Sequence, residues 1–183
     1  MLQWLRQKVL DWSRPASVEA ETLYRHIAEA ARNPDIYKKY QIEDSFDGRF
    51  DTVCLLTALV VHRLTKIDGE GKGRAQELTD TMFADMDLSL HEIGVSENKV
   101  GKKVKVMATA FVGRLKAYSK AFDENDAEAL AAALIRNLYR DRDMGGIESR
   151  LAKAVLKAAK RLKSLTDQSL MLGQIEPALD LDK

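Results

Sequence analysis

The sequence predicts an all-α protein, a single-domain bundle of about six to seven helices. Its 183 residues suffice for one domain with a substantial core and are too few for two comfortable ones. With only 10 glycines and 3 prolines, the chain lacks the turn residues that many short strands require. Apolar residues instead recur at helical spacing along most of the sequence. Together these observations favour helices packed on helices.

Three segments are expected: an amphipathic arm over residues 1–16, a helical domain over residues 17–172 and a flexible tail over residues 173–183. In the arm, Leu5, Val9 and Trp12 share one face of a helix, and Trp4 lies beside that face. Two tryptophans with a basic balance are typical of a helix that lies on a membrane surface. The alternative is an arm that packs on its own domain or on a partner protein.

The first half of the domain is predicted to contain two helices joined by a packed connection. Ser17 suits the N-cap of a helix over residues 17–33, which ends before Pro34 because proline disfavours helix in the preceding residue. Residues 35–47 are the least regular stretch, although their apolar side chains indicate that it is ordered. Residues 48–67 are apolar on nearly every side, which predicts a helix at the centre of the domain.

A glycine-rich linker is expected at residues 68–73, between the two halves of the domain. It does not match the phosphate-binding pattern GxxxxGK[ST], and no strand precedes it, so a nucleotide site is not expected there. Apolar residues at helical spacing then predict a helix over residues 74–93, with Gly94 as its C-cap.

Three further helices are predicted after Gly94. Ser96 is the expected N-cap of the first, whose apolar stripe continues to residue 122. Asn125 and Glu128 have the spacing of a capping box that opens a second, alanine-rich helix. The third is a long basic helix over residues 147–165.

Composition argues against several classes of function. The formal net charge is +1, so no global field favours nucleic acid or an acidic substrate. The single cysteine, Cys54, lies in an apolar run without a partner at ligand spacing, so neither a disulfide framework nor a structural zinc is expected. His62 also lacks a second ligand nearby in the sequence, which favours a structural histidine. We predict no cofactor, no metal and no catalytic residues, and therefore no enzyme.

The apolar runs of the chain are short. The most hydrophobic stretch, residues 52–62, is free of Asp, Glu, Lys and Arg for only eleven residues, whereas a spanning helix needs ~20. No signal-peptide pattern is visible. We therefore expect a cytoplasmic protein, with peripheral association on the inner face of the cytoplasmic membrane as a further option through the arm.

An acidic cluster in residues 74–93 is the first candidate for chemistry. At about 100° per residue, Asp85 and Asp87 point to nearly opposite sides of a helix. Asp85 and Glu92 share a side, but seven residues at ~1.5 Å rise separate their backbones by about 10 Å. Direct chelation of one ion is therefore not expected, even with Asp80 in the same helix.

Basic residues dominate the next helix, so residues 83–107 join an acidic segment to a basic one. Two solvated faces would explain this contrast, because exposed ion pairs contribute only about 0–1 kcal/mol. The functional alternative is a docking surface of mixed sign, on which charge sets register and encounter rate. Its candidate partner-binding residues are Asp85, Asp87, Glu92, Lys102, Lys105 and Arg114.

Basic residues also recur on the predicted last long helix, at Arg150, Lys153, Lys157, Lys160, Arg161 and Lys163. With the lysines between Lys102 and Lys120, they would make a patch suited to RNA or anionic lipid. No exposed aromatic residues accompany them, so sequence-specific nucleic-acid recognition is not expected. A peripheral membrane or RNA-binding helical module that acts through its basic helices is therefore the alternative function.

Five short blocks follow one another along the chain: DGRFD at residues 47–51, MFADMD at 82–87, EIGV at 92–95, VGKKVK at 100–105 and AFVGR at 110–114. Their order and spacing, over about residues 24–139, resemble the ubiquinol-cytochrome c chaperone family. Each block alone is a weak signal, and the five linked blocks are specific. His91 departs from the family pattern, in which a basic arginine is expected.

The resemblance implies a non-enzymatic assembly chaperone for ubiquinol-cytochrome c reductase, the respiratory complex III, acting on its newly made cytochrome b subunit. Mitochondrial members are associated with translating ribosomes and use a small helper protein, so the ribosome is a further candidate partner beside a membrane surface. Such a factor needs a surface that tolerates apolar segments and their charged flanks. Adaptable apolar contacts are expected from Met82, Met86 and Met107. The motif residues expected to be structural are Gly48, Arg49, Asp51 and Gly94.

Overall fold

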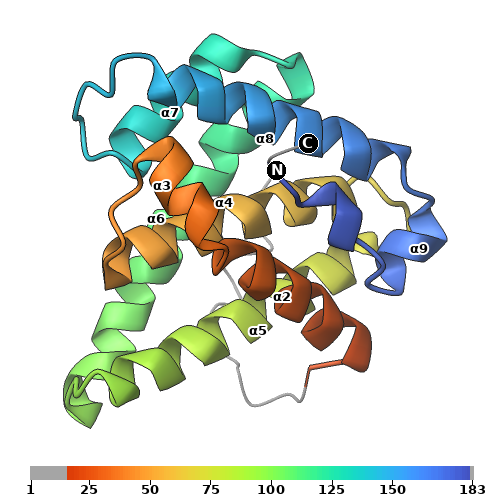
Figure 1. Ribbon diagram of the computed structural model, residues 1–183. Coiled ribbons are helices and arrows are strands. Elements are labelled where there is room, and N and C mark those ends of the chain that lie inside the picture. The colour runs from red at the N-terminus through yellow and green to blue at the C-terminus, as the bar shows by residue number, and fades with distance from the viewer. Residues whose placement is uncertain (1–15, 182–183) are drawn as a thin grey trace.

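The structure is a computed structural model that describes residues 16–181 (Figure 1). These residues form eight α-helices and one short 3-10 helix, without a strand. The predicted all-α, single-domain bundle is therefore confirmed. In chain order the elements are α2 (Val18–Ala31), α3 (Pro34–Tyr40), α4 (Phe46–Leu64), α5 (Gly71–Glu92), α6 (Glu97–Glu124), α7 (Ala127–Asn137), α8 (Ile147–Ser164), α9 (Asp167–Met171) and η1 (Glu176–Ala178).

Helix α4 occupies the centre of the bundle, as its apolar sequence predicts. Every residue from Phe50 to Val61 is buried, and α2, α5, α6 and α8 all pack against it. Cys54 is one of these buried residues and is a free thiol. Figure 1 shows α4 passing through the middle of the molecule, while α5 and α6 meet at a turn that extends away from α8.

The connection predicted at residues 35–47 contains a helix that the sequence analysis missed. Pro34 ends α2 and also begins α3, because proline fits the first turn of a helix, where its missing N–H is not needed. Asn33 caps this new helix, since its side chain accepts a hydrogen bond from the backbone N–H of Asp35 at 3.0 Å. The buried residues of α3 are Ile36, Tyr37 and Tyr40.

Two helix boundaries also differ from the prediction. Helix α5 begins at Gly71, inside the expected linker, where a Cβ would lie only 2.3 Å from the carbonyl oxygen of Leu64. The glycine therefore permits a close approach of two helix ends. Asn125 does not cap α7 but ends α6 in a left-handed conformation, with φ of 50°. Asp126 caps α7 through hydrogen bonds from two backbone N–H groups.

The C-terminal segment packs on the bundle as far as the structure describes it, which differs from the flexible tail expected at residues 173–183. Its apolar side chains are buried, and the hydroxyl of Tyr40 donates a hydrogen bond to the carbonyl oxygen of Leu181 at 3.1 Å. His26 bonds the carbonyl oxygen of Gly173 and lies 2.7 Å from a carboxylate oxygen of Glu176. The segment is too short to show helical periodicity in the sequence. Its burial depends on contacts with residues that are distant in the sequence. The buried apolar residues are Ile175, Ala178, Leu179 and Leu181.

The predicted N-terminal arm, with Trp4, Leu5, Val9 and Trp12, lies outside the described residues. Within residues 16–181 no helix combines the length and hydropathy that a membrane crossing requires. Membrane contact by the arm therefore stays a prediction.

The first turn of α4 gives a test of this packing. A Cβ at Gly48 would lie 1.9 Å from the carbonyl oxygen of Glu43, so Gly48→Ala should destabilise the fold by about 1–3 kcal/mol through overpacking. Gly113→Ala is the matched control, because nothing lies within 4 Å of the Cβ that it would add in α6. That control should stabilise the protein by about 0.5–1 kcal/mol through helix propensity. Urea unfolding of both variants measures the difference, and equal effects would contradict the packing described here.

Candidate functional site

One face of the molecule is hollowed in two places where α4, α5 and α6 meet. We call it the docking face and define it by the linings of the two hollows. The α5 hollow has a volume of about 230 Å³ and lies between α2, α4 and the C-terminal end of α5. The α6 hollow has a volume of about 430 Å³ and lies between α4 and the first half of α6. Phe46 and Phe50, on the first turns of α4, line both hollows and so join them into one surface.

The α5 hollow combines an apolar floor with charged groups of both signs. Asp85 and Glu92 supply its carboxylates, and Arg32 and Arg49 its guanidinium groups. The hydroxyl of Tyr24 donates a hydrogen bond to Asp85 at 2.6 Å. Burial, and then this hydrogen bond, raise the pKa of Tyr24, so the phenol stays protonated as a donor. The contact fixes the Asp85 carboxylate at the edge of the hollow.

The α6 hollow has a basic rim. Its charged lining residues are Asp47, Asp51, Lys102, Lys103, Arg114 and Arg140, an excess of two positive charges. The apolar lining includes Leu90, Val106 and Met107. A partner that enters this hollow would therefore meet an apolar surface bordered by cations.

A partly buried ion-pair network forms part of the lining of the α6 hollow. Asp51 is only 3% exposed, and its carboxylate oxygens lie 2.7 Å from Arg114 and 3.3 Å from Arg140. Arg114 also donates a hydrogen bond to the carbonyl oxygen of Asn137 at 3.3 Å and stacks over Phe50. Burial raises the pKa of Asp51 to about 6, although both arginines oppose this shift. The network thus joins α4 to α6 and to the end of α7.

Large apolar side chains stand exposed on this face. Val106 is 69% exposed and lines the α6 hollow, while Ile93 is 57% exposed and lines the α5 hollow. Leu88, also in α5, is 62% exposed but lines neither hollow. Exposed apolar residues that are grouped, with a polar rim, mark interaction sites more often than scattered ones do.

The structure brings four of the six predicted partner-binding residues to the docking face. Asp85 and Glu92 line the α5 hollow, and Lys102 and Arg114 line the α6 hollow. The other two line neither hollow: Asp87 lies 3.5 Å from His91, and Lys105 is exposed.

Arg114 differs from the other predicted partner-binding residues because its charge is paired with a buried carboxylate inside the protein. Its guanidinium group binds Asp51 and the Asn137 carbonyl oxygen, so it supports the hollow more than it offers a free charge. Among the methionines, Met82 is fully buried in the core, which removes it as a contact residue. Met86 and Met107 do line the hollows.

The four motif residues expected to be structural all lie at or near this face. Gly94 has a φ of 81°, a left-handed conformation that glycine adopts without strain, and it follows the end of α5. Gly48 approaches the Glu43 carbonyl closely, and Asp51 forms the buried network. Arg49 pairs with Asp44 at 2.6 Å and also lines the α5 hollow.

Apart from Met86 and Met107, sequence reasoning missed the apolar residues of the docking face. The sequence places Phe46 in a connection and Phe50 in a buried helix, and their position at both hollows depends on how α5 and α6 pack against α4. Val106 carried a usable signal, because it is an apolar residue that lies outside the buried stripe of its helix.

The carboxylates of the docking face are not grouped as metal ligands. Among the described residues, one group has His and carboxylate donor atoms within 4.8 Å of one another: His26, Glu29 and Glu176. It lies where the C-terminal segment meets α2 and shares no residue with either hollow.

The fold and this face define a class: an all-α protein with a hollowed apolar surface bordered by charges of both signs. A family model described as "Ubiquinol-cytochrome C chaperone" matches residues 38–177, so the chain belongs to this family. It is also similar to a solved structure titled "Crystal structure of the Cbp3 homolog from Brucella abortus", with 35% identity and a TM-score of 0.81. That similarity covers 100% of this chain and 98% of the other. No curated protein sequence matches the chain.

The predicted family resemblance is therefore confirmed. Membership of a chaperone family implies a non-enzymatic role. The docking-face residues on α4, α5 and α6 lie inside the matched region, whereas α2, which contributes Tyr24, precedes it.

The buried Asp51 should give the fold a pH dependence. Its pKa is raised from 3.8 to about 6, so folding takes up a proton between these values. The stability that it contributes is therefore present below about pH 4 and is lost as the pH rises through 6. Urea unfolding of the wild type and of Asp51→Asn should show the wild type losing on the order of 2 kcal/mol relative to the variant between pH 4 and pH 7. If the wild type instead gained stability relative to the variant as the pH rises, the arginines would stabilise the Asp51 carboxylate more than burial destabilises it.

Proposed function

We propose that the protein is a non-enzymatic assembly chaperone for ubiquinol-cytochrome c reductase, the respiratory complex III, and that it holds newly made cytochrome b on the docking face. Family membership supports the assembly role. The observation that carries the proposal is the exposed apolar surface of Ile93 and Val106 over two joined hollows.

A subunit destined for the membrane presents apolar segments with charged flanks before it is inserted. The aromatic floor of Phe46 and Phe50 suits the apolar segments, because burial of apolar area drives such binding without directional requirements. The flexible side chains of Met86 and Met107 can adapt to different apolar shapes. The docking face therefore suits a client with apolar segments of different sequence.

The charges around the hollows would orient this client. Lys102 and Lys103 contribute to the net positive charge of the α6 hollow, whereas the two carboxylates of the α5 hollow are balanced by its two arginines. The two hollows therefore differ in net charge. Such complementarity sets register and encounter rate more than affinity. The client would thus bind in one direction, with its acidic flank toward α6.

A cytoplasmic location, with the inner face of the cytoplasmic membrane and the ribosome as further contacts, fits a factor that meets its client during synthesis. The alternative of one basic patch for RNA or lipid has less support, because the part of α6 with Lys102 and Lys105 lies far from α8 (Figure 1).

Deletion of the gene should lower the amount of assembled complex III, and cytochrome b made during a short pulse should co-purify with the tagged protein. Normal complex III levels in the deletion strain would overturn the proposal. Spectroscopic quantification of cytochrome b and native electrophoresis provide the two measurements.

A matched pair of variants tests the docking face itself. Val106→Asp places a charge in the apolar surface and should lower co-purified cytochrome b by about tenfold or more, the loss expected when an apolar contact is replaced by a desolvated charge. Val18→Asp is the control, because Val18 is 74% exposed and lines neither hollow. Both variants should unfold at the wild-type urea concentration within error. Equal recovery of cytochrome b with the two variants would exclude Val106 from the contact.

A further inference from the structure

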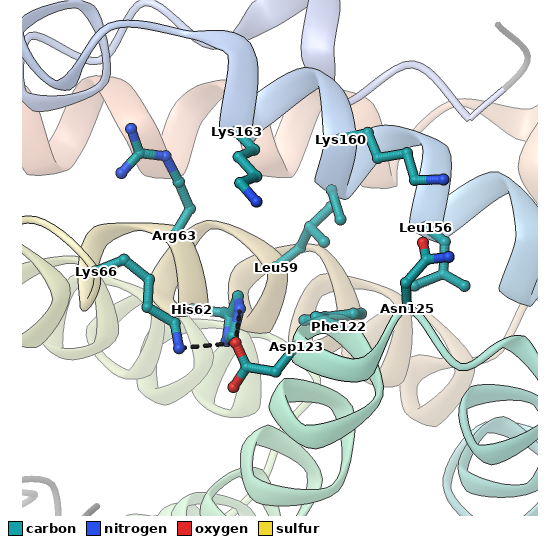
Figure 2. A pocket seen from close by; sticks show the side chains of 11 residues that line it. Leu59, His62, Arg63, Lys66, Phe122, Asp123, Asn125, Leu156, Lys160 and Lys163 are labelled. Atoms are coloured by element: carbon teal, nitrogen blue, oxygen red, sulfur yellow. Dashed lines mark ion pairs between the residues drawn. The ribbon is translucent and has the colours of Figure 1, made fainter.

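A larger cavity lies elsewhere on the molecule, where the C-terminal ends of α4 and α6 meet α8 (Figure 2). Its volume is about 590 Å³, and it shares no lining residue with the docking face. Cavities of about 300–1,000 Å³ are typical of small-molecule sites. Its lining residues are Leu59, His62, Arg63, Lys66, Phe122, Asp123, Asn125, Leu156, Ala159, Lys160 and Lys163.

The inner wall of the cavity is apolar. Leu59, Phe122 and Leu156 are buried side chains that nevertheless line it, one from each of the three helices. His62 packs edge-on against Phe122, with 5.4 Å between the ring centroids. Burial lowers the pKa of His62; Asp123, whose carboxylate oxygen lies 3.4 Å from the ring nitrogen Nε2, opposes this shift, and Lys66 adds to it.

The rim of the cavity is basic. Four cations face one carboxylate, Asp123, and that carboxylate is already paired with Lys66 at 2.7 Å. Arg63 is likewise engaged with Asp167. Two positive charges therefore remain over an apolar wall.

These charges belong to Lys160 and Lys163, which stand one turn apart on α8. Both are exposed, and no hydrogen bond or ion pair within residues 16–181 engages either ammonium group. Figure 2 shows Lys163 extending from α8 toward the α4 side of the cavity and Lys160 extending toward Asn125. Because the two residues are three apart on one exposed helix face, rotation of their flexible side chains brings both ammonium groups within reach of a single anionic group, which then receives two charge-assisted hydrogen bonds.

We propose that this cavity binds a small amphipathic anion, with its carboxylate or phosphate head at Lys160 and Lys163 and its apolar body against Leu59, Phe122 and Leu156. An inorganic anion would leave the apolar wall unused, and a neutral apolar molecule would leave the two ammonium groups unused. The concave shape favours a single ligand molecule over a flat membrane surface. The inference is independent of the client that the docking face holds.

Calorimetric titration of the full-length protein with decyl phosphate, kept below its micelle concentration, tests this site. Binding should be at least about tenfold tighter than for inorganic phosphate or decanol, because only the amphiphile uses both parts of the cavity. It should weaken as salt is raised, since the head-group contacts are exposed to screening. Equal affinity for decyl phosphate and decanol would overturn the proposal.

A double charge reversal locates the site. Lys160→Glu with Lys163→Glu should weaken decyl phosphate binding by about tenfold or more. Lys153→Glu with Lys157→Glu is the matched control, because both residues are exposed on α8 and line a different hollow, of about 240 Å³. The control should bind within about twofold of the wild type. Equal weakening by both pairs would show unspecific attraction to a basic helix and would overturn the site.

The same variants distinguish two sources of the ligand. If it is a lipid of the bilayer, flotation with vesicles that contain phosphatidylglycerol should fall on reversal of Lys160 and Lys163 and persist in the control. If it is a soluble amphiphile, decyl phosphate should bind while flotation is the same for all variants. Failure of this site would leave the docking face and its cytochrome b client untouched, because the two surfaces share no lining residue.

Discussion

The burial of α4 on all sides is the constraint on which the rest of the structure depends. A helix without a polar face is stable only when neighbours cover it completely, and α2, α5, α6 and α8 provide that cover. The one charge inside this helix that is deeply buried, Asp51, requires compensation, which Arg114 and Arg140 supply from α6 and from the segment after α7. The burial of α4 therefore fixes both the apolar packing and the position of the ion-pair network.

The docking face forms where the neighbouring helices no longer cover α4. Near the first turns of α4, α5 and α6 extend away from the rest of the bundle to their shared turn (Figure 1), and Phe46 and Phe50 line hollows on two sides. The network at the α6 hollow holds α6 in place there. The apolar surface offered to a partner is thus the edge of the core itself, held by a buried carboxylate and its arginines.

Much of the fold could be predicted because the distribution of apolar residues around a long helix reports its burial, whether they cover every side or form one stripe. The central position of α4 and the basic helix α8 are examples. Features that depend on tertiary packing could not be predicted. Pro34 was interpreted only as the end of a helix, although it also begins α3, and the burial of Ile175 and Leu179 needs partners distant in the sequence. At the candidate site, charge pattern located Asp85, Glu92 and Lys102, whereas Arg114 is engaged by Asp51, which no local pattern reveals.

The central claim is that the apolar docking face, with its charged rims, contacts nascent cytochrome b. Site-specific photo-crosslinking tests it most directly, with the crosslinker placed at Val106 or at Val18 during a pulse of cytochrome b synthesis. The two positions have similar exposure, 69% and 74%, so accessibility alone would label both equally. The account predicts a cytochrome b adduct from position 106 and none from position 18. Adducts of equal yield from both positions, or an adduct from position 18 alone, would contradict it.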